Sequence, residues 1–101
     1  MIAKLEHKTR YLQIAFNYDA RMAKSILPTL AFSERILIEA GTPFIKREGM
    51  TGIRMIRRNW PGHIVADIKT VDGAVGEVDM VRSAGATAAT VLGNSPIETL
   101  D

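Results

Sequence analysis

The 101-residue sequence contains no cysteine. This absence excludes disulfide bonds and thiolate metal sites, and it is typical of proteins in a reducing compartment, so we expect a cytoplasmic protein. Long apolar runs are lacking too, because no segment approaches the length that crosses a membrane. The first ten residues carry charges where a signal peptide needs an apolar stretch. We therefore expect no membrane partner.

A strong excess of one charge is also lacking, since 13 Lys and Arg residues stand against 11 Asp and Glu residues, for a net charge of +2. This balance does not indicate a nucleic-acid partner. One segment is nevertheless basic and carries Lys46, Arg47, Arg54, Arg57 and Arg58. It lacks the interleaved aromatic side chains of a base-stacking surface. We interpret it as the solvent-exposed face of a helix rather than as a phosphate or nucleic-acid patch.

The length is that of a single domain, 1–101, in which residues 1–10 form a polar arm or short helix and 11–101 form repeated strand–helix units. Apolar runs predict four strands, at 11–17, 35–41, 64–72 (with its last residues in a turn) and 86–93. Segments with helical spacing separate them. Strands that alternate with helices predict right-handed crossovers and a parallel α/β sheet.

Three helices are predicted between the strands. Asp19 is placed to cap the first, which runs through 20–27. The buried face of the second consists of Met50, Ile53, Ile56 and Trp60, and that of the third consists of Val75, Val78, Val81 and Ala84. We expect a turn at 41–43 before the second helix and a C-cap at Gly85 after the third. A last helix is expected to start at Pro96 with Ser95 as its cap.

Polar side chains stand where the predicted strands end. Asp67 and Lys69 leave the same face of the third strand because side chains alternate, and Asp72 follows in the next turn. Asn17 and Glu39 end the two preceding strands. Charges are costly at the carboxyl end of a buried strand, and α/β proteins place active sites there, so these residues form a candidate site. A structural ion-pair network, a surface carboxylate at Glu39 and a backbone-bonding Asn17 remain alternatives.

Three motifs stand at the ends of the predicted strands, namely Glu-Ala-Gly-Thr-Pro at 39–43, Ala-Asp-Ile-Lys-Thr-Val-Asp at 66–72 and Thr-Val-Leu-Gly at 90–93. Together they resemble the hexulose-6-phosphate synthase and 3-keto-gulonate-6-phosphate decarboxylase branch of the orotidine-5′-phosphate decarboxylase superfamily. The segment 12–17 is most similar to archaeal hexulose-phosphate synthases, including those fused to a formaldehyde-activating domain. The resemblance implies the first half, about four strands, of a (βα)8 TIM barrel that is normally a homodimer.

The resemblance also implies roles for the residues of the candidate site. Glu39 and Asp67 match Mg²⁺ ligands, Lys69 matches the cation beside a developing enediolate, and Asp72 matches an aspartate that reaches into the neighbouring subunit's site. Asn17 stands where many members carry aspartate, and it can orient a group by hydrogen bonding without adding charge. Carboxylate oxygens suit Mg²⁺, and a metal together with an ammonium can stabilise an oxyanion in the transition state.

The activity that this resemblance implies is that of a Mg²⁺-dependent aldehyde-lyase. Its substrates would be formaldehyde and a sugar phosphate, with ribulose 5-phosphate and hexulose 6-phosphate on the two sides of the reaction. The family's phosphate site lies in the second half of the barrel, so we expect this chain alone to be incomplete and the edges of strands one and four to be covered by another chain. The alternatives are a decarboxylase of the same superfamily and a non-catalytic half-barrel that assembles with a partner chain.

Overall fold

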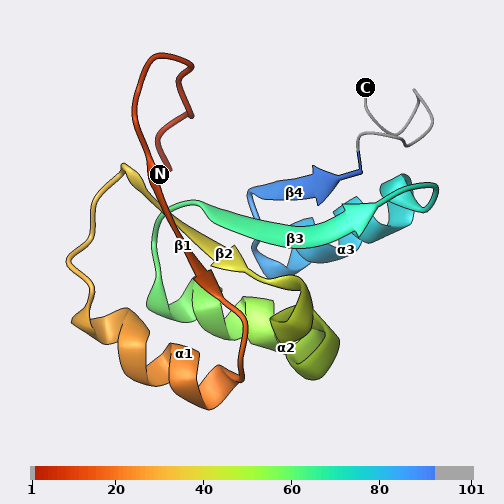
Figure 1. Cartoon of the computed structure of the whole chain (residues 1–101), viewed down its shortest axis with the longest axis horizontal. Helices are drawn as coiled ribbons and strands as arrows, with labels where there is room; N and C mark the ends of the chain where they lie inside the picture. The colour runs from red at the N-terminus through yellow and green to blue at the C-terminus, as the bar shows by residue number, and fades with distance from the viewer. Residues whose placement is uncertain (1, 93–101) are drawn as a thin grey trace.

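The computed structural model describes residues 2–92, in which strands and helices alternate (Figure 1). In chain order the elements are β1 (Leu12–Phe16), α1 (Ala20–Ile26), the 3₁₀ helix η1 (Leu27–Thr29), β2 (Ile36–Ala40), α2 (Thr42–Asn59), β3 (Ile64–Thr70), α3 (Ala74–Ala84) and β4 (Ala88–Val91). The four strands and three α-helices that the sequence predicts are confirmed. The expected helix at Ser95 and Pro96 lies outside the described residues. None of the helices within 2–92 has the length and apolar character that crossing a membrane requires.

The four strands form one parallel sheet in the order β1-β2-β3-β4. Because every strand pairs with the next one in sequence and parallel crossovers are right-handed, the connecting helices fall on one face of the sheet (Figure 1). The opposite face carries no helix in the described part of the chain. This is the arrangement of half of a (βα)8 barrel, as predicted.

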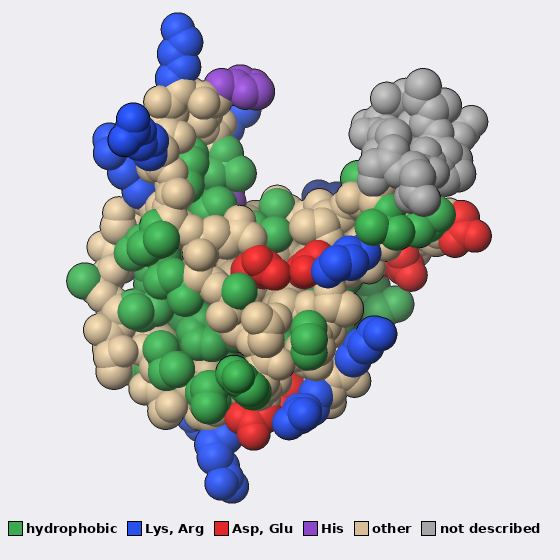
Figure 2. Space-filling model, in the orientation of Figure 1, with side chains coloured by type: hydrophobic (Ala, Val, Ile, Leu, Met, Phe, Trp, Pro, Cys, Tyr) green, Lys and Arg blue, Asp and Glu red, His purple; other side chains and the backbone are tan. Residues whose placement is uncertain are grey.

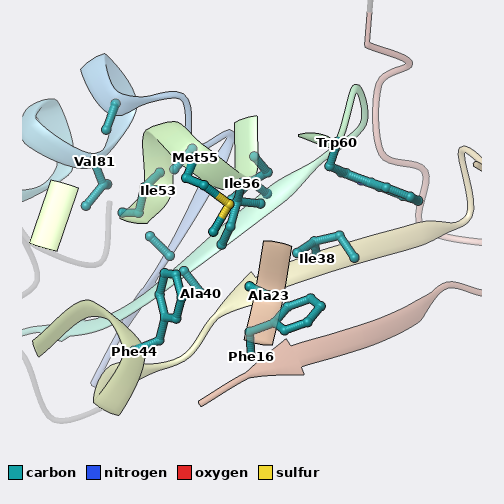
Figure 3. Packing of buried hydrophobic residues seen from close by; sticks show 14 of the residues in the cluster. Phe16, Ala23, Ile38, Ala40, Phe44, Ile53, Met55, Ile56, Trp60 and Val81 are labelled. Carbon is teal, nitrogen blue, oxygen red and sulfur yellow. The ribbon is translucent and has the colours of Figure 1, made fainter. Parts of the chain in front are cut away.

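The hydrophobic core lies between the sheet and the helices (Figure 3). The predicted buried face of α2 is confirmed, since Ile53, Ile56 and Trp60 are almost completely buried and Met50 packs against the same cluster. The strands contribute alternate side chains to this core, namely Phe16, Ile38, Ala40, Ile64 and Ala66. Because the core takes every second residue of each strand, the residues between these positions point to the other face of the sheet. Burial of one large apolar side chain in the core stabilises the fold by about 1.5–3 kcal/mol.

The predicted buried face of α3 is partly wrong. Val81 and Ala84 are buried, but Val75 is 82% exposed. Residues at successive three-residue intervals drift about 60° around a helix at each step, so four of them span about half of its circumference and cannot all face the sheet. The C-cap is confirmed, because Gly85 has φ 120° and its N–H donates to the carbonyls of Val81 and Arg82.

Two expectations for the segment 41–58 are also wrong in part. Residues 42–43 begin α2 instead of forming a turn, with Pro43 in the first helical turn, where its missing N–H costs no hydrogen bond. The basic residues do not all face solvent, because Arg57 is half-buried and donates to the carbonyls of Trp60, Gly62 and Gly85. The other four, Lys46, Arg47, Arg54 and Arg58, are exposed as predicted.

The N-terminal arm, residues 2–10, lies beside the start of β3. The arm contains no helix over 2–10, and the His63 ring nitrogen Nε2 lies 2.5 Å from the Ala3 carbonyl, which ties the arm to the start of β3. The arm therefore lies at the amino ends of the strands, away from the predicted site.

Asp19 caps α1 as predicted, since its Oδ1 accepts from the Met22 N–H at 2.9 Å.

Candidate active site

The candidate site lies on the face of the sheet opposite the helices. Glu39 follows the buried Ile38 and pairs in register with Ala15 on one side and Val65 on the other. Asp67 is two residues beyond Val65, so its side chain leaves β3 on the same face as Glu39. Acidic and basic side chains gather over the ends of β2 and β3 on this face (Figure 2).

Asp67 and Lys69 form a close ion pair. Lys69 Nζ lies 2.6 Å from Asp67 Oδ2, and the side chains are 49% and 18% exposed for Lys69 and Asp67, respectively. The pair is therefore open to a ligand on the lysine side and enclosed on the aspartate side. The prediction that Asp67 and Lys69 lie on the same face of the third strand is therefore confirmed.

The backbone of β3 is irregular at this pair. Lys69 has φ 47°, and the pairing of β3 with β4 shifts register between Ala66 and Thr70. A left-handed conformation is unfavourable for a residue with a β-carbon, and such strain clusters at functional sites. The sequence alone contains no sign of this bulge, because the apolar and charged pattern of 64–70 is that of a regular strand.

Two threonines complete the site, and sequence reasoning missed both of them. Thr42 Oγ1 donates to the Asp67 carbonyl at 2.7 Å and accepts from Lys69 Nζ at 2.7 Å. Thr90 Oγ1 donates to Asp67 Oδ1 at 2.6 Å and accepts from the Lys69 N–H at 3.0 Å. Their position within the motifs 39–43 and 90–93 was the available signal, since each threonine stands at the end of a strand or the start of a helix.

The surroundings of Asp67 favour its ionised form. Desolvation raises the pKa of the carboxyl, but the hydrogen bonds from Lys69 and Thr90 and the charge of the Lys69 ammonium outweigh it and hold the pKa of Asp67 below its ordinary value. The pair is therefore a carboxylate beside an ammonium. Two of the three N–H donors of Lys69 are used by Asp67 and Thr42 within residues 2–92, which leaves the third for a ligand.

Glu39, Asn17 and Asp72 occupy three different settings. Glu39 is partly buried and its Oε1 accepts from Gln13 Nε2 at 2.5 Å. Asn17 follows β1, with its side chain against Gly41 at the start of α2. Asp72 lies exposed in the turn after β3, beyond the bulge. The structure thus places Asp67 and Lys69 together, with Glu39 on the same face, and leaves Asp72 exposed in the turn after the strand.

Comparison with known proteins decides the family. Residues 10–101 match the Orotidine 5′-phosphate decarboxylase / HUMPS family. The chain belongs to this family. Among curated proteins, it is 44% identical over 93 residues to the bifunctional enzyme Fae/Hps of Methanosarcina barkeri and 38% identical over 91 residues to that of Methanocaldococcus jannaschii. These alignments cover 90% and 89% of this chain, and the chain spans 24% of the length of each relative.

Two solved structures agree with the observed fold. The 3-hexulose-6-phosphate synthase from Salmonella typhimurium superimposes with a TM-score of 0.80 at 32% identity over 89% of this chain. The 3-keto-L-gulonate-6-phosphate decarboxylase from Vibrio cholerae superimposes with a TM-score of 0.81 at 32% identity over 90% of this chain. The match covers 43% of each of those chains, so it corresponds to a half-barrel.

The residues of this family member suit a magnesium ion by their chemistry. Glu39 and Asp67 present two carboxylates on one face of adjacent strands. No group of three or more potential protein ligands occurs within 2–92. Mg²⁺ needs no such group, because it is commonly bound by one or two carboxylates together with waters and substrate oxygens. The donor set therefore fits Mg²⁺ and would not suit a metal that requires several nitrogen or sulfur ligands.

Proposed function

We propose that this chain supplies the first-half residues of a Mg²⁺-dependent aldehyde-lyase that joins formaldehyde to ribulose 5-phosphate, or cleaves the resulting hexulose 6-phosphate. The observation that carries the proposal is the Lys69 ammonium held 2.6 Å from Asp67 at the end of β3, on the face that Glu39 shares. The names of the similar proteins, hexulose-6-phosphate synthase and the bifunctional enzyme Fae/Hps, support the choice of substrates.

Each residue of the pair has a distinct task in this reaction. Lys69 directs its remaining N–H toward the oxygen of ribulose 5-phosphate that gains negative charge as an enediolate forms, and stabilises that charge. Asp67 orients the ammonium through the ion pair. Mg²⁺, when held by Glu39 and Asp67, would act as a Lewis acid toward substrate oxygens. Asn17, at the end of β1, would orient a substrate hydroxyl by hydrogen bonding.

The assembly forms part of the same proposal. We propose a homodimer in which Asp72 reaches the site of the second subunit. Its exposed position in the turn after β3 supports this, because an exposed side chain is available to a neighbour. A size measurement that finds only monomers would contradict it.

A decarboxylase is the second candidate, because the V. cholerae decarboxylase superimposes as well as the synthase does. Both reactions develop an enediolate, so the Asp67–Lys69 pair serves either one. The two candidates differ in substrate. Turnover of 3-keto-gulonate 6-phosphate without turnover of formaldehyde and ribulose 5-phosphate would decide for the decarboxylase.

The decisive experiment is an assay of the purified full-length protein with formaldehyde and ribulose 5-phosphate, with and without Mg²⁺. Lys69→Ala is expected to lower kcat/KM by about 100-fold or more, the usual effect of losing one oxyanion-stabilising donor, while circular dichroism and unfolding remain close to wild type. Lys46→Ala removes an exposed lysine of α2 and serves as the matched control. Unchanged turnover in Lys69→Ala would rule out its role. A wild-type protein that neither turns over nor binds the substrates would favour the non-catalytic half-barrel.

A further inference from the structure

One hydroxyl group connects both members of the ion pair. Thr90 Oγ1 accepts from the backbone N–H of Lys69 at 3.0 Å and donates to Asp67 Oδ1 at 2.6 Å. A threonine hydroxyl has one proton and two lone pairs, so both hydrogen bonds can form at once. The Lys69 N–H would otherwise have no ladder partner, because the β3–β4 pairing is interrupted between Ala66 and Thr70.

The irregular backbone of β3 gives the Thr90 hydroxyl a structural role. Lys69 adopts φ 47°, a conformation that costs about 1–2 kcal/mol for a residue with a β-carbon. A strained backbone persists only where surrounding contacts hold it. In β3 the hydrogen bond from the Lys69 N–H to Thr90 holds the peptide, and the bonds from Lys69 Nζ to Asp67 and Thr42 hold the side chain.

We propose that Thr90 is a positioning residue whose single hydroxyl sets both the left-handed conformation of Lys69 and the orientation of the Asp67 carboxylate. The inference deepens the proposed function, because it names what aims the ammonium at the substrate. Thr90 acts through Lys69 and Asp67 and has no required contact with the substrate. Valine has the shape of threonine without its hydroxyl, whereas serine keeps the hydroxyl, so the two replacements separate shape from hydrogen bonding.

The chain offers a matched control at the other end of the same segment. Thr87 also carries a hydrogen-bonded hydroxyl, 2.8 Å from His63 Nδ1, and it lies at the amino end of β4, away from the ion pair. Thr87→Val therefore makes the same chemical change three residues earlier. A general loss of stability in this part of the sheet would affect both variants alike, whereas loss of positioning would affect Thr90→Val alone.

The test uses the full-length protein and two independent measurements. In Thr90→Val, hydrogen exchange of the Lys69 amide is expected to accelerate about three- to tenfold, the equivalent of one lost hydrogen bond. The kcat is expected to fall about tenfold or more with KM within about twofold, because misplacement of a catalytic group lowers the rate of the chemical step. Thr90→Ser should restore both values, and Thr87→Val should change neither.

The outcomes separate this inference from the proposed function. Unchanged exchange of the Lys69 amide in Thr90→Val would overturn the positioning role, whatever the activity. If the wild type has no turnover but Thr90→Val accelerates the exchange and Thr90→Ser restores it, the positioning role holds and the proposed function fails. Should Thr90→Val not fold, Thr90→Ala is compared with Thr90→Ser by the same exchange measurement, with equal rates overturning the inference.

Discussion

The side chain of Asn17 lies directly against the α-carbon of Gly41. A β-carbon added to Gly41 would overlap Asn17 Oδ1 and would lie 2.9 Å from the Phe16 carbonyl oxygen. That carbonyl also accepts from the Gly41 N–H at 2.9 Å. The ends of β1 and β2 therefore approach so closely that only glycine fits, and this contact fixes the position of the Asn17 side chain at the end of β1.

Gly41→Ala is accordingly expected to destabilise the protein by about 1–3 kcal/mol, because the added methyl group must displace Asn17 or the backbone. Urea unfolding would measure the change. Gly76→Ala is the control: Gly76 lies inside α3, and a β-carbon added there would meet no heavy atom within 4 Å, so alanine should stabilise the helix by about 0.5–1 kcal/mol. Equal effects of the two substitutions would contradict the contact between Asn17 and Gly41.

Arg57 joins the C-terminal ends of two helices. Its guanidinium donates to the carbonyls of Trp60 and Gly62 after α2 and to the Gly85 carbonyl after α3, at 2.8–3.1 Å. Arg57→Met keeps much of the side-chain volume but leaves these carbonyls without their donor, so we expect a loss of about 2 kcal/mol or more in the free energy of unfolding. Arg58→Met, at an exposed neighbouring position, should change it by less than about 0.5 kcal/mol.

The features that depend on the local pattern of apolar and polar residues could be predicted from the sequence. Alternation along the chain indicated the four parallel strands, and it placed Asp67 and Lys69 on one face of β3. The contacts that it missed join residues far apart in sequence, such as Arg57 with Gly85 and Thr90 with Asp67. Pattern contains no information on such pairs, because an arginine on a helix has the same helical spacing whether it faces solvent or three carbonyls.

The bulge at Lys69 could not be predicted for a related reason. A left-handed residue is usually suggested by glycine or asparagine, and here the position is occupied by lysine. Its conformation depends on a hydroxyl from β4, twenty-one residues later. Local residue preference therefore favours a regular strand, and the tertiary contact overrides it. The bulge lies at the candidate site, where local rules are most often broken.

Glu48 links α2 to the first turn of α1. Its Oε2 accepts from the Ala20 N–H at 2.6 Å, next to the Asp19 cap. Gly49, with φ 62° and ψ −154°, interrupts α2 immediately after it. Glu48→Ala should cost about 1 kcal/mol and accelerate hydrogen exchange of the Ala20 amide, because a helix N-terminus loses an acceptor. Glu48→Gln retains an acceptor and should lose less; an unaffected Ala20 amide in Glu48→Ala would contradict the link.

The ionisation of Asp67 should make stability depend on pH in the acid range. Its pKa is lower in the folded protein than in the unfolded chain, because the hydrogen bonds and charge of its neighbours outweigh desolvation. The carboxylate therefore stabilises the fold above an ordinary aspartate pKa of about 3.9, and this contribution is lost as the pH falls through the lower folded value. In metal-free buffer, the stability difference between wild type and Asp67→Asn should shrink below about pH 4. The difference for Asp79→Asn, at an exposed position of α3, provides the control for removal of one charge.

Lys69 itself offers a test of strain at the site. Lys69→Ala and Lys69→Gly both remove the ion pair with Asp67, so the difference between them reports the backbone at φ 47°. Alanine retains the penalty of a left-handed residue, about 1–2 kcal/mol, whereas glycine relieves it at the cost of about 0.4–1 kcal/mol of additional entropy in the unfolded chain. Lys69→Gly should therefore be the more stable variant by about 0.5–1 kcal/mol in urea unfolding. In a regular strand glycine would be the less stable of the two, so a less stable Lys69→Gly variant would contradict the left-handed conformation of Lys69.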